Sequence, residues 1–382
     1  MNDNDNLTWI RITDPTFKPS DYESVAAVLS SGWVSMGTNV SSVENLCGRL
    51  AGTAHAVAVS SCSIAQLLVL RAWGVGPGSE VVTTPLTWPS IVASALELGA
   101  TVRYADVDEK TWCLSVDTIA QRITSDASII GVVHFGGSVV DLSALAIIFS
   151  NCQILEDAAH VNYGRANWGI TGSGGDAATV SFGGPKMITG GEGGVITTDS
   201  GELAESLRLL RNSGEKQTSL HKWQTHSATS TIITGSLNHR MPEVAAALVA
   251  SQLDRYDQIV SARHMVGKIL RLEIERLGRE DIQLQDLGAS EEVAPFVFPV
   301  LTRDPQERDE LLRRLREARI EAGRHYPLVY QRPAYVQTRW HNGKDQSCPV
   351  AESIASRIIS IPCHQWLSLA DVERIVSVIA YF

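Results

Sequence analysis

The sequence predicts an α/β protein in which a mainly parallel sheet is followed by a smaller α+β domain. Between about residues 55 and 200, short β-rich runs alternate with helical runs, and this alternation is typical of βαβ units. After about residue 240 the alternation stops and the helical runs become longer. We therefore expect a large domain, including the N-terminal segment, at residues 1–250 and a small C-terminal domain at residues 251–382.

The strands of the large domain follow from short runs of β-branched and aliphatic residues. They are expected at 56–59, 80–84, 101–105, 129–134 and 153–156. Helices are expected between them at 64–73, through 93–98, and at 142–149. Gly74, Gly76 and Gly78 follow a helix and precede a strand, which is the reverse of the order in a dinucleotide-binding loop, so they predict a tight turn.

The C-terminal part has a different pattern. An apolar stripe at helical spacing predicts one long helix that leaves the large domain, with Ala245, Val249, Leu253, Tyr256 and Val260 on one face. A strand is expected at 296–301, followed by a helix that ends at Gly323. The basic run at 312–316 alternates with apolar residues and is interpreted as the solvated face of that helix.

Composition limits the classes of function. The 382 residues carry 32 Lys and Arg against 42 Asp and Glu, a net charge of −10, which argues against binding of nucleic acid or an anionic membrane by bulk charge. The six cysteines form no Cys-x-x-Cys pair, so no metal site and no disulfide framework are expected. No apolar run approaches the length of about 18 residues that a membrane span needs, and the N-terminus is polar, so we expect a cytoplasmic protein.

Two residues are candidates for chemistry. Asp157 follows a predicted strand, and ligands bind at the carboxyl ends of strands in parallel α/β sheets. Lys186 stands among small residues at 183–185, where a lysine can be desolvated and its pKa lowered, as a Schiff-base amine requires. From these residues alone, a helix-capping Asp157 and a surface Lys186 stay open as alternatives.

Further motifs occur in a fixed order along nearly the whole chain. They are Gly32-Trp33 with Gly37, Ser60-Ser61-Cys62-Ser63, 76–82 through Thr87-Trp88, 133–136, 156–160, Ser181-Phe182 with Lys186, 191–194, 235–241 and Ile361-Pro362. In this order they resemble the DegT/DnrJ/StrS family of pyridoxal-phosphate aminotransferases, which make amino sugars and aminocyclitols. The resemblance implies the type I fold of aspartate aminotransferase-like enzymes.

The resemblance also implies a role for each residue around the cofactor ring. Lys186 is expected to bind pyridoxal 5'-phosphate covalently as an internal aldimine and to carry a proton between substrate and cofactor. Asp157 is expected to pair with the pyridinium nitrogen, so that the ring acts as an electron sink. His160 is expected beside the phenolic oxygen, and Trp88 is expected to stack on the ring face. Pyridoxamine phosphate is the expected intermediate.

The cofactor phosphate needs hydrogen-bond donors. Ser61, Cys62 and Ser63 immediately precede a predicted helix, where main-chain N–H groups and the helix dipole favour an anion. The hydroxyls of Ser63 and Ser181 are expected to add hydrogen bonds. Asn238 matches a family asparagine that reaches the phosphate from the partner subunit, which implies a homodimer with shared active sites.

The chain departs from the family pattern beside the expected site. Cys62 replaces the usual Gly and Ser63 the usual Thr, and a Cβ at position 62 crowds the turn if a positive φ is required there. The residues at 183–185, Gly-Gly-Pro, replace a bulkier or polar tripeptide and could widen the substrate side.

The expected reaction is transfer of an amino group from an amino acid, glutamate or glutamine, to a nucleotide-linked keto-sugar in amino-sugar or antibiotic biosynthesis. A keto-cyclitol is the alternative acceptor. The family's sugar dehydratases carry a histidine in place of the lysine, so Lys186 argues against a dehydratase. The presence of Lys186, Asp157 and Trp88 together argues against a catalytically silent regulator.

Overall fold

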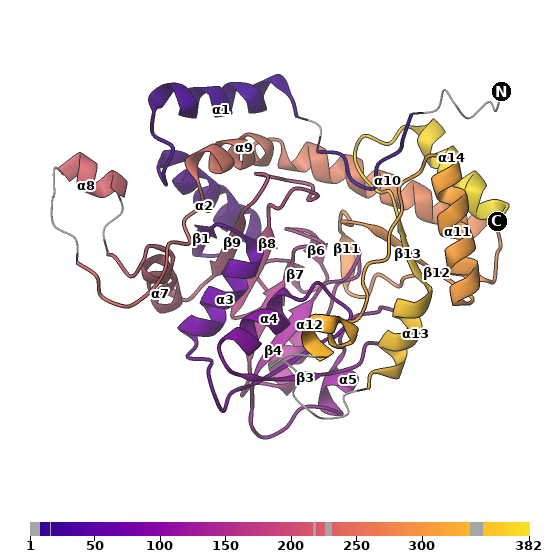
Figure 1. The fold of residues 1–382 in the computed structure, drawn as a ribbon, viewed down its shortest axis with the longest axis horizontal. Coiled ribbons are helices and arrows are strands. Elements are labelled where there is room, and N and C mark those ends of the chain that lie inside the picture. Colours follow the sequence, from indigo (N-terminus) through magenta and orange to yellow (C-terminus); the bar gives the residue numbers. More distant parts are fainter. Residues whose placement is uncertain (1–7, 16, 217–218, 226–230, 337–346) are drawn as a thin grey trace.

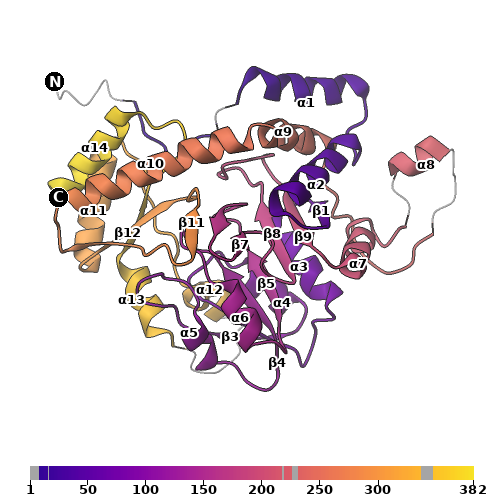
Figure 2. The same cartoon turned by 180° about the vertical axis from the view of Figure 1, so that it is seen from behind.

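The computed structural model describes residues 8–15, 17–216, 219–225, 231–336 and 347–382. At its centre is a seven-stranded sheet in the order β1-β9-β8-β5-β4-β2-β3 (Figures 1 and 2). In that order the strands are β1 (His55–Val59), β9 (Gly194–Thr198), β8 (Ala177–Ser181), β5 (Gln153–Asp157), β4 (Ala127–Val133), β2 (Glu80–Thr83) and β3 (Thr101–Tyr104). Strand β9 is antiparallel to both of its neighbours, and the other pairs are parallel. The mainly parallel sheet is therefore confirmed.

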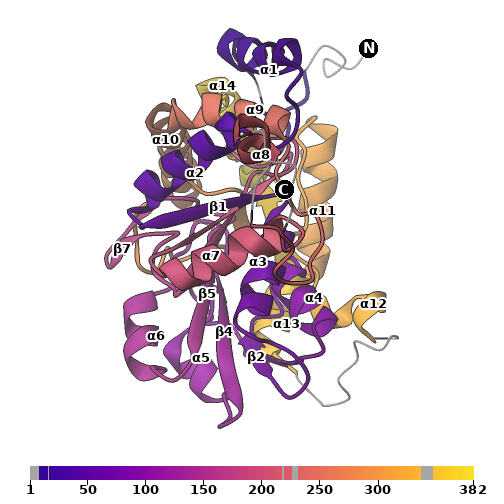
Figure 3. The same cartoon turned by 90° about the vertical axis from the view of Figure 1, so that its left-hand side faces the viewer.

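Helices cover both faces of this sheet (Figure 3). On one side lie α3 (Cys62–Ala72), α4 (Ser90–Glu97) and α7 (Gly201–Arg211), and on the other lie α5 (Val116–Ala120) and α6 (Leu142–Ile148). At strand β1 the two faces of the sheet pack in different apolar cores. Val57 and Val59 pack in one core while Ala56 and Ala58 pack in the other, because successive side chains of a strand point to opposite faces.

Three further helices pack beside the second of these cores. They are α1 (Pro19–Ser31), α2 (Thr38–Ala51) and α9 (Glu243–Leu253), and α9 contacts both of the others. The short helix α8 (Ser219–Thr225) projects at the edge of the molecule, beyond α7 (Figures 1 and 2). These helices lie around the edge of the sheet that β1 and β9 form.

A third core forms around a small antiparallel sheet of β10 (Ile282–Leu284), β12 (Phe298–Thr302) and β13 (Ile358–Ile361). The helices α10 (Tyr256–Arg276), α11 (Pro305–Glu317) and α14 (Leu369–Ala380) pack on it. The remaining elements are β6 (Arg165–Ala166), β7 (Gly169–Ile170), β11 (Ser290–Glu292), η2 (Val329–Gln331), α12 (Pro333–Val336) and α13 (Pro349–Arg357). The division of domains at residue 250 stays a prediction.

The expected strands of the large sheet are confirmed to within about two residues, and so is the glycine-rich turn. Gly74 and Gly78 join α3 to β2 with φ values of 76° and 94°. The basic run at 312–316 is confirmed as a solvated helix face, because Arg313 and Arg314 both pair with Glu310. Within the described parts of the chain, no helix combines the length and apolar character needed to cross a bilayer.

The prediction of one long helix through residues 245–260 is wrong, because the chain breaks into α9 and α10. Arg255 leaves the helical conformation, with φ −113° and ψ 18°, and its guanidinium pairs with the buried carboxylate of Asp21 on α1 at 2.9 Å. The apolar stripe nevertheless continues across the break, because Leu253 and Tyr256 pack in the same core. Hydrophobic spacing alone therefore does not detect the interruption.

The expected helix end at Gly323 is also wrong, because α11 stops at Glu317. Arg319 takes a left-handed backbone, with φ 54°. Its carbonyl then accepts a hydrogen bond from the N–H of Ile10 at 2.9 Å, and the N–H of Glu321 donates to the carbonyl of Ile10 at 2.8 Å. The N-terminal segment thus competes for the main-chain groups that would continue the helix.

Candidate active site

A cavity of about 340 Å³ lies where the carboxyl ends of β4 and β5 meet the first turn of α3 and the loop after β8. Such edges collect ligands because the carboxyl ends of parallel strands lie side by side. Seven of the eight expected site residues line the cavity, although they come from segments far apart in the sequence: Cys62, Ser63, Trp88, Asp157, His160, Ser181 and Lys186.

Asp157 is the last residue of β5, and its side chain is only 5% exposed. Its Oδ1 accepts a hydrogen bond from the N–H of Ala159 at 3.0 Å, and its Oδ2 accepts one from Nε2 of Gln66 at 2.8 Å. Burial raises the pKa of Asp157, while these hydrogen bonds and the charge of Lys186 oppose the rise. The chain after Asp157 forms turns rather than a helix, so the alternative of a helix cap is wrong.

Lys186 lies in the loop between β8 and β9, with its Nζ 3.7 Å from the centroid of the Phe296 ring. Burial lowers the pKa of Lys186 to about 8, although the nearby Asp157 and Cys62 act in the opposite direction. The alternative of an ordinary surface lysine is therefore wrong. A lysine with this pKa carries a useful fraction of neutral amine near neutral pH, as a nucleophile requires.

The first turn of α3 forms one end of the cavity. Ser61 caps this helix, and its Oγ accepts a hydrogen bond from the N–H of Ile64 at 3.2 Å. The N–H groups of Cys62 and Ser63 have no acceptor within the helix, because they precede its first hydrogen-bonded turn. Cys62 does not have a positive φ, so its Cβ does not strain the turn. A Cβ on Gly194 would lie 2.5 Å from the nitrogen of Cys62, so the glycine makes room for this turn.

Two aromatic residues of the C-terminal part complete the cavity, and sequence reasoning missed both. His325 and Tyr326 come from the segment between α11 and η2 and line the cavity. The Tyr326 ring packs against His160 and Trp88, and the His325 ring packs against Phe296 and Tyr326. Burial lowers the pKa of His325 to about 4 and raises that of Tyr326. No periodicity or short-range spacing connects these residues with the strand ends, so nothing in the local sequence marks them.

Trp88 stands at the open side of the cavity and is 55% exposed, so it is not a core residue. One contact is with Tyr326, edge to face, with ring centroids 6.0 Å apart. The guanidinium of Arg332 lies 5.7 Å from the centroid of the Trp88 ring. A large flat surface thus stays accessible in the cavity that Lys186 also lines.

Asn238 is the one expected site residue that does not line this cavity. It is exposed and pairs by a β-bridge with Asn212 at the end of α7. Its Oδ1 accepts a hydrogen bond from the N–H of Arg240 at 3.1 Å. Within one chain, Asn238 is therefore separate from the other seven residues.

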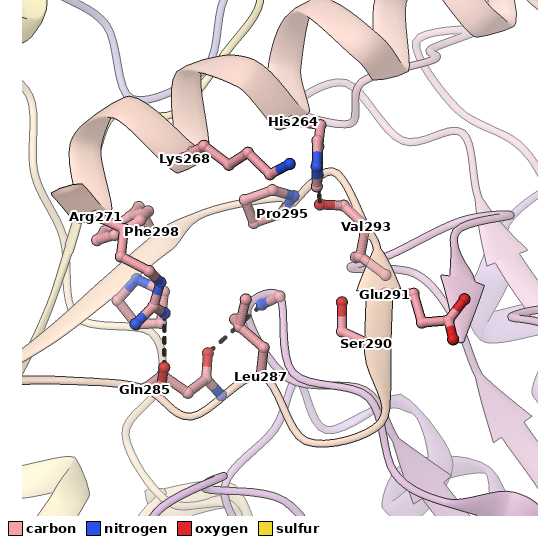
Figure 4. A pocket seen from close by; sticks show the side chains of 13 residues that line it. His264, Lys268, Arg271, Gln285, Leu287, Ser290, Glu291, Val293, Pro295 and Phe298 are labelled. Carbon is pink, nitrogen blue, oxygen red and sulfur yellow. Dashed lines mark hydrogen bonds between the residues drawn. The ribbon is translucent and has the colours of Figure 1, made fainter. Parts of the chain in front are cut away.

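Helix α10 positions the Phe296 ring that covers Lys186. The buried Arg263 donates from Nε to the carbonyl of Pro295 at 2.8 Å and from Nη2 to the carbonyl of Phe296 at 2.7 Å. A second hollow, of about 120 Å³, lies between α10 and the segment that joins β10 to β12 (Figure 4). There His264 and Arg271 also donate to main-chain carbonyls of this segment, at 2.9 and 2.7 Å (Figure 4). The polar groups of this hollow thus hold the cavity wall in place.

The residues present fit pyridoxal phosphate. The amides of the first turn of α3 suit its phosphate, the buried carboxylate of Asp157 suits its ring nitrogen, and the desolvated Lys186 suits its aldehyde. In a sheet of this topology, the three features define the class of pyridoxal-phosphate enzymes with the type I aminotransferase fold.

The sequence pattern of the DegT/DnrJ/EryC1/StrS aminotransferase family matches residues 15–380, and the chain belongs to this family. It is a pyridoxal-phosphate-dependent aminotransferase, with pyridoxamine phosphate as the form of the cofactor that carries the amino group. The resemblance inferred from the sequence motifs is thereby confirmed.

Relatives of known identity cover almost the full length of the chain. The spore coat polysaccharide biosynthesis protein SpsC of Bacillus subtilis is 30% identical over 96% of this chain and 95% of its own. The UDP-4-amino-4-deoxy-L-arabinose–oxoglutarate aminotransferase of Shewanella sediminis is 30% identical over 97% of both chains. Among solved structures, 3-amino-5-hydroxybenzoic acid synthase is 26% identical, with a TM-score of 0.84 over 98% of this chain and 97% of its own.

Proposed function

We propose that this enzyme transfers an amino group from glutamate or glutamine to a nucleotide-linked keto-sugar in the biosynthesis of an amino sugar, of the kind built into polysaccharides or antibiotics. Two relatives support the proposal, since one is named for polysaccharide biosynthesis and the other for a nucleotide-linked amino sugar. The second name also includes oxoglutarate, which is the keto acid that glutamate leaves when it gives up its amino group.

The observation that carries the proposal is the placement of Lys186 and Asp157 in one cavity. Bound pyridoxal phosphate supplies an electron sink for the carbon that loses or gains the amino group. Lys186 holds the cofactor and, once displaced by the incoming amine, moves the proton at that carbon through its Nζ. Asp157 keeps a negative charge beside the ring nitrogen, which favours the protonated ring.

The other expected residues orient the cofactor in this proposal. The first turn of α3, with Cys62 and Ser63, binds the phosphate together with the hydroxyl of Ser181. Trp88 stacks on the ring from the open side, where its exposed face is available. His160 lies beside the phenolic oxygen of the ring.

A homodimer belongs to the same proposal, with Asn238 reaching the phosphate of the partner subunit. Its position outside its own cavity and its exposure support this role. Large apolar side chains are also exposed in the segment between α7 and α9, which contains Asn238: Trp223, Ile232, Ile233 and Leu237. Exposed apolar side chains that gather in one segment are typical of a protein–protein interface. The proposed location is the cytoplasm, in keeping with six cysteines that all have free thiols.

A keto-cyclitol is the second candidate acceptor. The similarity to 3-amino-5-hydroxybenzoic acid synthase favours it, since that protein is named for an aminated carbocycle. The Gly183-Gly184-Pro185 segment also lines the cavity without bulky side chains, which leaves room for either kind of ring.

The test is a visible absorption spectrum of the protein loaded with pyridoxal phosphate, followed by separate additions of glutamate and glutamine. We expect the band of the lysine-bound cofactor to fade with one of the two donors and the matching keto acid to form. The amino-loaded enzyme is then offered nucleotide-linked keto-sugars and keto-cyclitols, and return of the band identifies the acceptor class. A band that ignores every amino acid contradicts the proposal.

A further inference from the structure

Gln66 lies on α3, one turn after Cys62, and its side chain is 0% exposed. Its Nε2 donates to Oδ2 of Asp157 at 2.8 Å and lies 3.4 Å from Oγ1 of Thr179. Its Oε1 has no hydrogen-bond partner among the residues that the structure describes. Gln66 does not line the cavity, so it reaches the site only through Asp157.

The unpaired oxygen of Gln66 indicates that stability is not the reason for a glutamine here. A buried acceptor without a partner loses its hydration and gains nothing in return, whereas an apolar side chain of the same shape avoids this loss. Buried polar groups that stay unsatisfied in a folded protein call for a functional explanation. The one strong contact that the amide makes is with the carboxylate of Asp157.

The geometry of the carboxylate shows what this contact does. Ala159 holds Oδ1 from the loop after β5, and Gln66 holds Oδ2 from α3, so the two oxygens are fixed from different elements. One hydrogen bond alone would leave the carboxylate free to turn about its Cβ–Cγ bond. Helix α3 also presents Cys62 and Ser63 to the cavity, so the same rigid element sets the phosphate turn and the orientation of Asp157.

We propose that Gln66 is a positioning residue, which holds the Asp157 carboxylate in the orientation that meets the ring nitrogen of the cofactor. This inference rests on the proposed role of Asp157. It predicts that Gln66 affects the affinity only for ligands that have a ring nitrogen. A residue that merely fills the core would affect every ligand of the cavity alike.

The experiment compares two ligands in the apoprotein. One is pyridoxal phosphate, and the other is its analogue with a C–H group in place of the ring nitrogen. The wild-type protein is expected to bind pyridoxal phosphate more tightly. The measured quantity is the dissociation constant of the analogue divided by that of pyridoxal phosphate. The variant is Gln66→Met, which keeps the length and volume of the side chain and removes the amide.

We expect Gln66→Met to reduce this ratio by about tenfold, because a hydrogen bond to a charged group contributes a free energy of about that size. Its thermal midpoint is measured alongside, so that a loss of folding is distinguished from a loss of ligand preference. Thr179→Val is the matched control, because it changes the weaker neighbour of Gln66 and leaves the contact with Asp157, so its ratio should stay at the wild-type value.

Gln66→Asn is the second variant, to be used if Gln66→Met does not fold. It keeps an amide in the core but withdraws it from Asp157 by one methylene, and the same loss of preference is expected. A wild-type ratio in either folded variant overturns the inference, and so does an equal loss of affinity for both ligands. A wild-type protein that binds neither ligand overturns the proposed function instead.

Discussion

The phenolic oxygen of Tyr326 lies 3.0 Å from Nε2 of His160 in the wall of the active-site cavity. On the other side of the ring, the N–H of Gly136 donates to Nδ1 at 3.3 Å, so Nδ1 is the acceptor and Nε2 carries the proton. Burial lowers the pKa of His160 well below its ordinary value, which keeps the ring neutral. Tyr326 therefore accepts from His160, and its own proton is left for a group in the cavity.

Replacing Tyr326 by phenylalanine tests this relationship. Tyr326→Phe removes the acceptor of His160 and the free proton but keeps the ring packing against Trp88. We expect the rate of amino transfer to fall about fivefold to tenfold, since a neutral hydrogen bond has about that weight. The measurement is kcat/KM for the acceptor alongside a thermal melt. Tyr335→Phe, which changes a tyrosine that does not line the cavity, is the comparison, and equal rates in the two variants contradict the assignment.

Lys186→Ala is expected to abolish the visible band of lysine-bound cofactor and to lower amino transfer by at least about a thousandfold, because both the attachment and the proton carrier are lost. The checks are the absorption spectrum and product formation. Lys268→Ala, at an exposed lysine of α10, serves as the control and should keep wild-type values. Measurable turnover in Lys186→Ala with an intact band would show that another amine does the chemistry.

The pH dependence of cofactor uptake follows from Lys186. Its pKa of about 8 means that the amine is mainly protonated below pH 8 and mainly neutral above it. Only the neutral amine attacks an aldehyde, so the rate at which apoprotein takes up pyridoxal phosphate should rise with pH and level off above a midpoint near pH 8. Stopped-flow absorbance at a series of pH values measures this rate. A midpoint near the ordinary lysine pKa would contradict the desolvated position of Lys186.

Asp157→Asn is expected to keep bound pyridoxal phosphate, because Lys186 still attaches it, but to lower amino transfer by about a hundredfold or more. Removal of one partner from a buried pair of charges commonly costs a free energy of this size. Cofactor content after gel filtration and the rate of the reaction with glutamate test the two parts separately. Unchanged activity would mean that another group supports the ring nitrogen.

Trp88→Ala is expected to weaken the binding of pyridoxal phosphate about tenfold, because the flat surface at the open side of the cavity disappears. Trp88→Phe keeps a flat ring and should recover most of the affinity. A titration of apoprotein followed by absorbance measures both dissociation constants. Wild-type affinity in the alanine variant would show that Trp88 contributes only to the rim of the cavity.

The local sequence predicts the ends of the expected strands to within about two residues, and it predicts the residues that lie at those ends. Asp157 and Lys186 are candidates because one lies at a strand end and the other among small residues, and the family motifs around them assign their roles. The possible crowding at Cys62 could not be decided from the sequence, since it depends on a backbone angle and on the missing side chain of Gly194. The break at Arg255 depended in the same way on its pairing with the distant Asp21.

The sequence by itself determined the alternation of strands and helices in the large domain, the family and the residues expected around the cofactor, because periodicity and motif order can be read along the chain. Only the tertiary structure decided which distant groups complete the site. Phe296 over Lys186, Tyr326 beside His160 and Gln66 against Asp157 all join segments that lie far apart in the chain. Such contacts arise when packing of the cores brings these segments together, and no spacing rule along the chain records them.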